Sequence, residues 1–182
     1  MEKIINFYSN FIKLEKVIRK GWVMCNVPEE RMESVGDHTL QTLMLASVIT
    51  KELKLNVDTF KLMEMLLIHD IGETIIGDIS IVEDDYEIKK QKEREAVHKV
   101  LTNLSEDTSN YYYNLWCEME QQNTPIAKLA FQIDKLDAVI KAKIYENNYN
   151  LNGLFDEFYS HQEEKQTFQN SVLEDGFNKL KK

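Results

Sequence analysis

The segment LLIHDIGETIIGDIS (residues 66–80) sets four polar side chains among leucine and isoleucine residues: His69, Asp70, Glu73 and Asp78. Isolated charges in an apolar core are costly, so buried ones are normally paired, protonated or bound to a metal ion. We therefore expect a helix that ends near His69 and Asp70 and presents these groups to a metal.

Helical spacing of apolar residues continues on both sides of this segment. Ser34 and Asp37 have the spacing of a capping box, so a helix should start near His38. Asp58 is a suitable N-cap for the helix that leads into His69. Residues 22–28 lack a helical period and should form an ordered loop. The other predicted helices cover residues 3–19, 85–104, 107–122, 125–145, 154–159 and 163–181.

Length and composition indicate one all-α domain spanning residues 1–182. The chain is 43% hydrophobic and 29% charged, and it contains only six Gly and two Pro. Single cores typically serve roughly 100 to 200 residues. Such a composition suits a compact helical globule, and no segment alternates as an exposed strand does.

The net charge restricts the class of partner. A formal charge of −9 disfavours nucleic acid polymers, whose binding requires clustered Lys and Arg, although a metal site can still attract an anionic small molecule. Residues 1–8 mix charged with apolar residues and do not have the pattern expected of a signal peptide, and no apolar run has membrane-spanning length. Cys25 and Cys117 resemble the reduced thiols of a cytoplasmic protein rather than a disulfide.

Four residues from three predicted helices are candidate metal ligands: His38, His69, Asp70 and Asp134. Mixed nitrogen and oxygen ligands suit Mn, Fe, Co, Zn or Mg and leave coordination positions for water and substrate. A His-Asp pair alone is weak evidence, because roughly one chain in four of this composition would contain it by chance. His38 alone fits a helix start equally well. The order of all four residues along the chain strengthens the prediction.

This order, together with four motifs, resembles the HD superfamily of metal-dependent phosphohydrolases. The motifs are GWVMCNV (21–27), ESVGDH (33–38), HDIGETIIGDI (69–79) and QIDKLD (132–137). They are similar to the branch that contains HD-domain 5'-deoxynucleotidases, over about residues 11–160. The resemblance implies a single-domain HD-fold helical bundle, one divalent metal ion, a small-molecule nucleotide substrate and a homodimer. The implied reaction removes phosphate from deoxynucleoside 5'-monophosphates.

The resemblance also implies roles for residues around the ligands. The family's acidic catalytic residue corresponds to Glu73, four residues after His69, where a carboxylic acid could protonate the leaving 5' oxygen or orient water. An ordinary loop glutamate is the simpler interpretation of the same residue. Asp78 corresponds to an acidic residue near the sugar and the attacking water, and its alternative role is a helix N-cap or turn.

Arg19 and Trp22 match positions that hold phosphate and sugar in the family. A guanidinium suits bidentate phosphate binding, and an indole can pack on deoxyribose. The Lys-Gly insertion between the two residues makes the alignment of Arg19 less secure than that of Trp22. Arg19 is also compatible with a solvated helix end.

Two other functions remain open at this stage. The same site could act on another nucleotide or phosphate ester, or the chain could be a catalytically silent metal-binding interaction module. The remaining histidines, His98 and His161, lack partners at ligand spacing and are expected on the surface. Their placement disfavours the dinuclear phosphodiesterases of the superfamily, which require additional histidine ligands.

Overall fold

A computed structural model describes residues 1–78 and 86–181, and within them the chain is helical apart from turns and one isolated antiparallel bridge. The all-α prediction is confirmed. The predicted helix start at Asp85 and the last two residues of the 66–80 segment lie outside the described ranges. The elements in chain order are α1 (Glu2–Phe11), η1 (Ile12–Lys16), α2 (Lys20–Met24), η2 (Glu29–Arg31), α3 (Val35–Glu52), α4 (Thr59–Ile68), α5 (Glu73–Ile76), α6 (Tyr86–Leu101), α7 (Glu106–Gln121), α8 (Pro125–Tyr149), α9 (Leu154–Glu164) and α10 (Glu174–Lys179).

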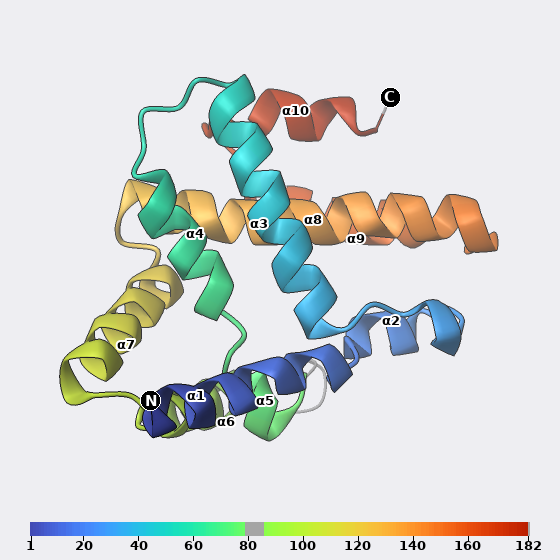
Figure 1. Ribbon diagram of the computed structural model, residues 1–182. Helices are drawn as coiled ribbons and strands as arrows, with labels where there is room; N and C mark the ends of the chain where they lie inside the picture. The colour runs from blue at the N-terminus through green and yellow to red at the C-terminus, as the bar shows by residue number, and fades with distance from the viewer. Residues whose placement is uncertain (79–85, 182) are drawn as a thin grey trace.

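Helix α8 is the central element of the bundle. It packs against α3, α4, α7 and α9, and α3 crosses it near the middle of its length (Figure 1). Thr124 caps its first turn by accepting a hydrogen bond from the N–H of Ala127, and Pro125 occupies the first helical position, as the sequence predicts. Because α8 is surrounded, much of its length is buried, including Ile133 and Val139.

The capping signals of α3 and α4 are confirmed. Ser34 and Asp37 form a capping box, although α3 starts at Val35 rather than near His38. Asp58 accepts a hydrogen bond from the N–H of Lys61 and caps α4. Helix α4 ends at Ile68, and His69 follows as its C-cap with helical backbone angles (φ −57°, ψ −41°), with Asp70 one residue further along.

The predicted helix over residues 3–19 is wrong in its second half. Helix α1 ends at Phe11, η1 follows, and the chain then becomes extended. The N–H of Val35 donates to the carbonyl of Val17 at 2.7 Å, and the N–H of Arg19 donates to the carbonyl of Glu33 at 3.3 Å. These long-range hydrogen bonds replace helical ones, and they bring Arg19 beside the start of α3.

The predicted loop over residues 22–28 is also wrong at its start, because α2 covers Lys20–Met24. Burial of Trp22 supports this short helix, since the indole is 1% exposed and packs in a second apolar cluster with Tyr145 and Leu154. Asn26, with φ of 57°, turns the chain away from the helical direction. Tertiary packing therefore produces a short helix in a segment whose sequence lacks a helical period.

The last part of the chain differs from the predicted helices over 154–159 and 163–181. Helix α9 runs to Glu164, and α10 covers only Glu174–Lys179. Between them Gln166 and Asn170 have φ of 53° and 56°, which a right-handed helix does not allow. The turns bury Phe168, whose ring stacks on Phe177 at 4.3 Å between centroids. The core contact replaces a continuous helix.

Gly36 marks a close approach between η1 and α3, and a side chain there should destabilise the fold. A Cβ atom at this position would lie 3.1 Å from the backbone N of Glu15. We expect Gly36→Ala to lower the free energy of unfolding by about 1–3 kcal/mol, as overpacking typically does, measured by urea denaturation. Gly21→Ala is the matched control, because nothing lies within 4 Å of its added Cβ. Equal stability of the two variants would contradict the prediction.

Candidate metal centre and substrate pocket

Three elements bring the predicted metal ligands together. His38 lies in the first turn of α3, His69 and Asp70 follow α4, and Asp134 lies within α8. The crossing of α3 and α4 over α8 places these positions side by side (Figure 1). The capping box at the start of α3 fixes the helical turn that carries His38.

The side chains converge within hydrogen-bonding distance. Nε2 of His38 lies 3.0 Å from Oδ1 of Asp134 and 3.4 Å from Nε2 of His69. Nε2 of His69 lies 3.0 Å from Oδ2 of Asp70. Ligand atoms of His38, His69 and Asp134 all lie within 4.8 Å of one another, a spacing that a metal ion could bridge. Asp70 adjoins this group, with Oδ2 3.9 Å from Nε2 of His38.

The hydrogen bonds of the two Nδ1 atoms determine which tautomer each histidine adopts. Nδ1 of His69 lies 2.7 Å from the carbonyl oxygen of Leu66, and Nδ1 of His38 lies 2.7 Å from Oδ2 of Asp137. Both partners are acceptors, so both Nδ1 atoms carry hydrogen in the neutral rings. Each Nε2 then presents a lone pair to the same point as two carboxylates. This set of acceptors fits a cation, and such histidine–acceptor pairs are typical supports of metal ligands.

Backbone contacts hold the turn after α4. The indole N–H of Trp116 on α7 donates to the carbonyl oxygen of His69 at 3.0 Å, which satisfies a carbonyl left unpaired at the helix end. Gly72 lets this turn approach α6, because a Cβ there would lie 3.0 Å from Cγ2 of Val97. The contacts position His69 and lead the chain directly into Glu73 at the start of α5.

The charged groups of the centre shift one another's pKa values. Burial lowers the pKa of His69, but the carboxylates of Asp70 and Asp134 outweigh burial and raise it to about 9. Burial raises the pKa of Asp70, but the neighbouring His69 and His38 hold it well below its usual range. Asp134 is likewise shifted well below its usual pKa, by Lys135 and both histidines against the effect of burial. In the metal-free protein a proton on His69 thus takes the place of a cation.

Metal binding should therefore release a proton and strengthen as pH rises. Because the pKa of His69 is about 9, we expect the affinity for Mn²⁺ to increase about tenfold per pH unit between pH 6 and 8. Isothermal titration calorimetry in buffers of different ionisation enthalpy measures both the affinity and the released proton. A flat affinity over this range would contradict the prediction.

The raised pKa of His69 also stabilises the metal-free fold below pH 6.5, and this stabilisation is lost as pH rises through about 9.

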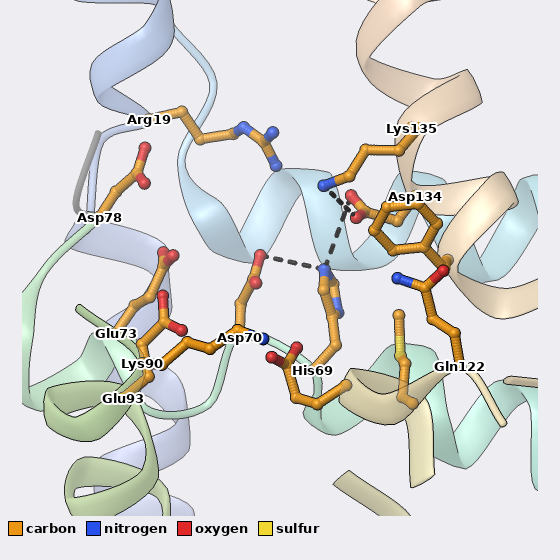
Figure 2. Close-up of a pocket in the computed structure, with 13 residues that line it drawn as sticks. Arg19, His69, Asp70, Glu73, Asp78, Lys90, Glu93, Gln122, Asp134 and Lys135 are labelled. Atoms are coloured by element: carbon orange, nitrogen blue, oxygen red, sulfur yellow. Dashed lines mark ion pairs between the residues drawn. The ribbon is translucent and has the colours of Figure 1, made fainter. Parts of the chain in front are cut away.

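A pocket of about 270 Å³ opens beside the centre (Figure 2). Of the predicted site residues, His69, Asp70, Glu73, Asp78, Asp134 and Arg19 line it. The other lining residues are Lys90 and Glu93 of α6, Met119, Glu120 and Gln122 at the end of α7, and Phe131 and Lys135 of α8. The pocket thus combines three of the four proposed ligands with the two predicted catalytic carboxylates and with cations.

Arg19 and Asp78 have structural contacts at the pocket wall. Oδ2 of Asp78 accepts a hydrogen bond of 2.6 Å from the N–H of Lys20, which joins the segment after α5 to the start of α2. Nε of Arg19 lies 3.7 Å from Oε1 of Glu33. Burial lowers the pKa of Arg19, but the surrounding carboxylates, Asp70 first, raise it above its ordinary value, so the guanidinium stays charged.

Trp22 is the one predicted substrate residue that the structure does not bring into the pocket. Its ring stacks on Phe158 at 4.8 Å between centroids, and its N–H donates to Oε1 of Glu33 at 2.8 Å. The same Glu33 oxygen faces Arg19. Trp22 therefore contacts the carboxylate that adjoins Arg19, and a direct contact with a sugar in the pocket is not supported.

Glu33, His38 and Asp137 form a second buried group of potential ligands, but the protein itself supplies its cation. Nζ of Lys141 lies 2.9 Å from Oε2 of Glu33. Nδ1 of His38 is engaged by Asp137. Because Lys141 forms an ion pair with Glu33 and Nδ1 of His38 faces Asp137, we assign this group to the support of Arg19 and His38.

Several functional contacts escape sequence reasoning. The sequence places Asp137 near Asp134, one helical turn away, yet the structure pairs it with His38. Phe131 also lies one turn from Asp134, so its helical spacing places it on the same face of α8. The pocket residues of α6 and α7 carry no comparable signal, because their approach to the centre depends on tertiary packing.

Comparisons with known proteins show the family of this chain. The family model described as HD domain matches residues 11–173. The human protein named 5'-deoxynucleotidase HDDC2 is 36% identical over 157 residues, covering 86% of this chain and 74% of its own length. The mouse protein of the same name is 35% identical, with coverage of 86% and 76%. The solved structure of the PH0347 protein from Pyrococcus horikoshii has a TM-score of 0.79 at 27% identity and covers 96% of each chain. This chain belongs to the HD domain family.

Proposed function

We propose that this protein is a metal-dependent 5'-deoxynucleotidase, which removes phosphate from (deoxy)nucleoside 5'-monophosphates. The observation that carries the proposal is the convergence of two histidine Nε2 atoms and two carboxylates on one point at the wall of a pocket. Relatives covering most of the chain at 35–36% identity are named 5'-deoxynucleotidases. An acidic metal-binding module without catalytic function would not require Glu73 and Asp78 to line the same pocket.

We assign metal binding to His38, His69, Asp70 and Asp134. Their mixed nitrogen and oxygen donors are compatible with Mn²⁺, Co²⁺, Fe²⁺, Zn²⁺ or Mg²⁺. When bound, a divalent ion would polarise the phosphate and lower the pKa of the attacking water. Asp137 and the carbonyl of Leu66 hold the two imidazoles in an orientation in which each Nε2 could bind the ion.

The remaining pocket residues provide the other requirements of phosphate ester hydrolysis. Arg19 binds the phosphate, since a guanidinium matches its oxygens in geometry and charge. Glu73 transfers a proton to the leaving 5' oxygen or orients the attacking water. Asp78, next to Glu73 in the pocket, positions the sugar or the water while its hydrogen bond to Lys20 fixes its own place.

A substrate panel tests this proposal. Purified protein with Mn²⁺ or Co²⁺ should release inorganic phosphate from deoxynucleoside 5'-monophosphates, assayed in parallel with the corresponding ribonucleotides. Release of pyrophosphate from a nucleoside diphosphate or triphosphate instead would assign the site to another phosphate ester. If the metal is bound and no monophosphate is hydrolysed, the proposal is wrong.

We also propose a homodimer located in the cytoplasm. Helix α1 buries none of its residues, and Ile4, Ile5 and Tyr8 are 57–60% exposed, which is typical of a face that contacts another chain. Sedimentation equilibrium measures the oligomeric state.

Both cysteines are free thiols, in keeping with a reducing compartment. None of the described helices combines the length and apolarity needed to cross a membrane.

A further inference from the structure

Two cationic side chains approach the metal centre from different elements. Arg19 extends from the segment before α2, and Lys135 extends from α8, directly after Asp134. Figure 2 shows the two side chains pointing toward one another on one side of the pocket, above Asp70 and His69. Both side chains line the pocket. The carboxylates of Glu73, Asp78 and Glu93 lie together on another side (Figure 2).

The pocket has more carboxylates than cations, so the position of its cations determines where it can bind an anion. Its described lining includes three cations, Arg19, Lys90 and Lys135, and six carboxylates, Asp70, Glu73, Asp78, Glu93, Glu120 and Asp134. A phosphate dianion would be repelled by most of this surface, even after a divalent ion has neutralised two charges. Cations beside the metal centre can attract it, and Arg19 and Lys135 are two such cations.

Lys135 is held there by contacts that leave its charge directed at the pocket. Nζ lies 2.8 Å from Oδ2 of Asp134, whereas Oδ1 of the same carboxylate faces His38. Nζ also lies 5.0 Å from the ring centroid of Phe131, which also lines the pocket. An ammonium has three N–H donors, so its ion pair with Asp134 leaves donors for a ligand.

We propose that Lys135 is a second phosphate-binding residue, which together with Arg19 clamps the phosphate of the substrate beside the metal centre. A terminal phosphate monoester carries close to two negative charges at neutral pH and so matches two cations. A diester carries one charge and gains less from the pair. The inference deepens the proposed function and rests on it for the identity of the substrate, but phosphate binding itself can be measured without turnover.

Inorganic phosphate is the probe, titrated into the Mn²⁺-loaded protein by calorimetry. We expect Lys135→Gln to weaken phosphate binding about 10- to 100-fold, the loss expected for one charge-assisted hydrogen bond. Lys135→Arg keeps the cation and should stay within about threefold of the wild type. Lys128→Gln, an exposed position on the same helix, is the matched control and should bind phosphate as the wild type does.

Mn²⁺ affinity separates this role from a purely structural one. If Lys135 only supports Asp134, Lys135→Gln will bind Mn²⁺ more weakly but, once saturated, will bind phosphate normally; that result overturns the inference. Unchanged phosphate affinity in Lys135→Gln, or no phosphate binding by the wild type, also overturns it. Phosphate binding that depends on Lys135, without hydrolysis of any nucleotide, would refute the proposed function and leave the clamp supported.

Discussion

Replacing His69 by alanine should abolish metal binding and, with it, phosphatase activity. His69 presents Nε2 to the same point as His38, Asp70 and Asp134, and its Nδ1 hydrogen bond to Leu66 holds it in that orientation. Loss of a residue that only supports a ligand typically weakens metal binding 10- to 100-fold, so loss of the ligand itself should weaken Mn²⁺ binding by more than about 100-fold. Equilibrium dialysis against Mn²⁺ measures the effect.

His161→Ala is the matched control for this variant. His161 is exposed on α9, far along the chain from the centre, so its loss should leave both Mn²⁺ affinity and turnover unchanged. Thermal denaturation shows whether each variant is folded. If folded His69→Ala retained the wild-type affinity for Mn²⁺, the ligand assignment would be wrong.

Replacing Glu73 by alanine should leave metal binding intact but strongly reduce turnover. Glu73 lines the pocket at the start of α5 but lies outside the group of ligand atoms that converge on the centre. General acid–base groups typically contribute 10²- to 10⁴-fold to the rate, so kcat should fall by about that factor. Steady-state kinetics at saturating Mn²⁺ measures kcat, and equilibrium dialysis measures the bound metal.

Glu95→Ala provides the comparison for Glu73→Ala. Glu95 is exposed on α6, where its only described side-chain hydrogen bond is to Gln91, and its loss should not change kcat. If Glu73→Ala and His69→Ala lost metal to the same extent, Glu73 would belong to the metal centre instead of acting on protons. If Glu73→Ala turned over at the wild-type rate, the proton-transfer role would be refuted.

Local signals in the sequence predict the helices around the site well. Backbone N–H groups within three residues donate to the side chains of Ser34, Asp37, Asp58 and Thr124, and Pro125 has no N–H that needs a partner at the first helical position. These interactions are local, so they operate before and after the chain folds. The break after Phe11 escapes prediction, because it depends on hydrogen bonds between residues 17–19 and 33–35. The apolar period of residues 3–19 contains no information about that pairing.

The candidate site likewise has features that local sequence patterns predict and features that depend on long-range packing. The sequence by itself predicted the candidate ligands and the helix positions that carry them, because His38, His69, Asp70 and Asp134 stand at helix starts, ends and edges that local patterns define. Only the tertiary structure decided that Trp22 lies in the core, that Asp137 supports His38, and that Lys135 faces Arg19. These relations depend on how α3, α4 and α2 pack on and around α8, and residues distant in sequence acquire a defined separation only when that core forms.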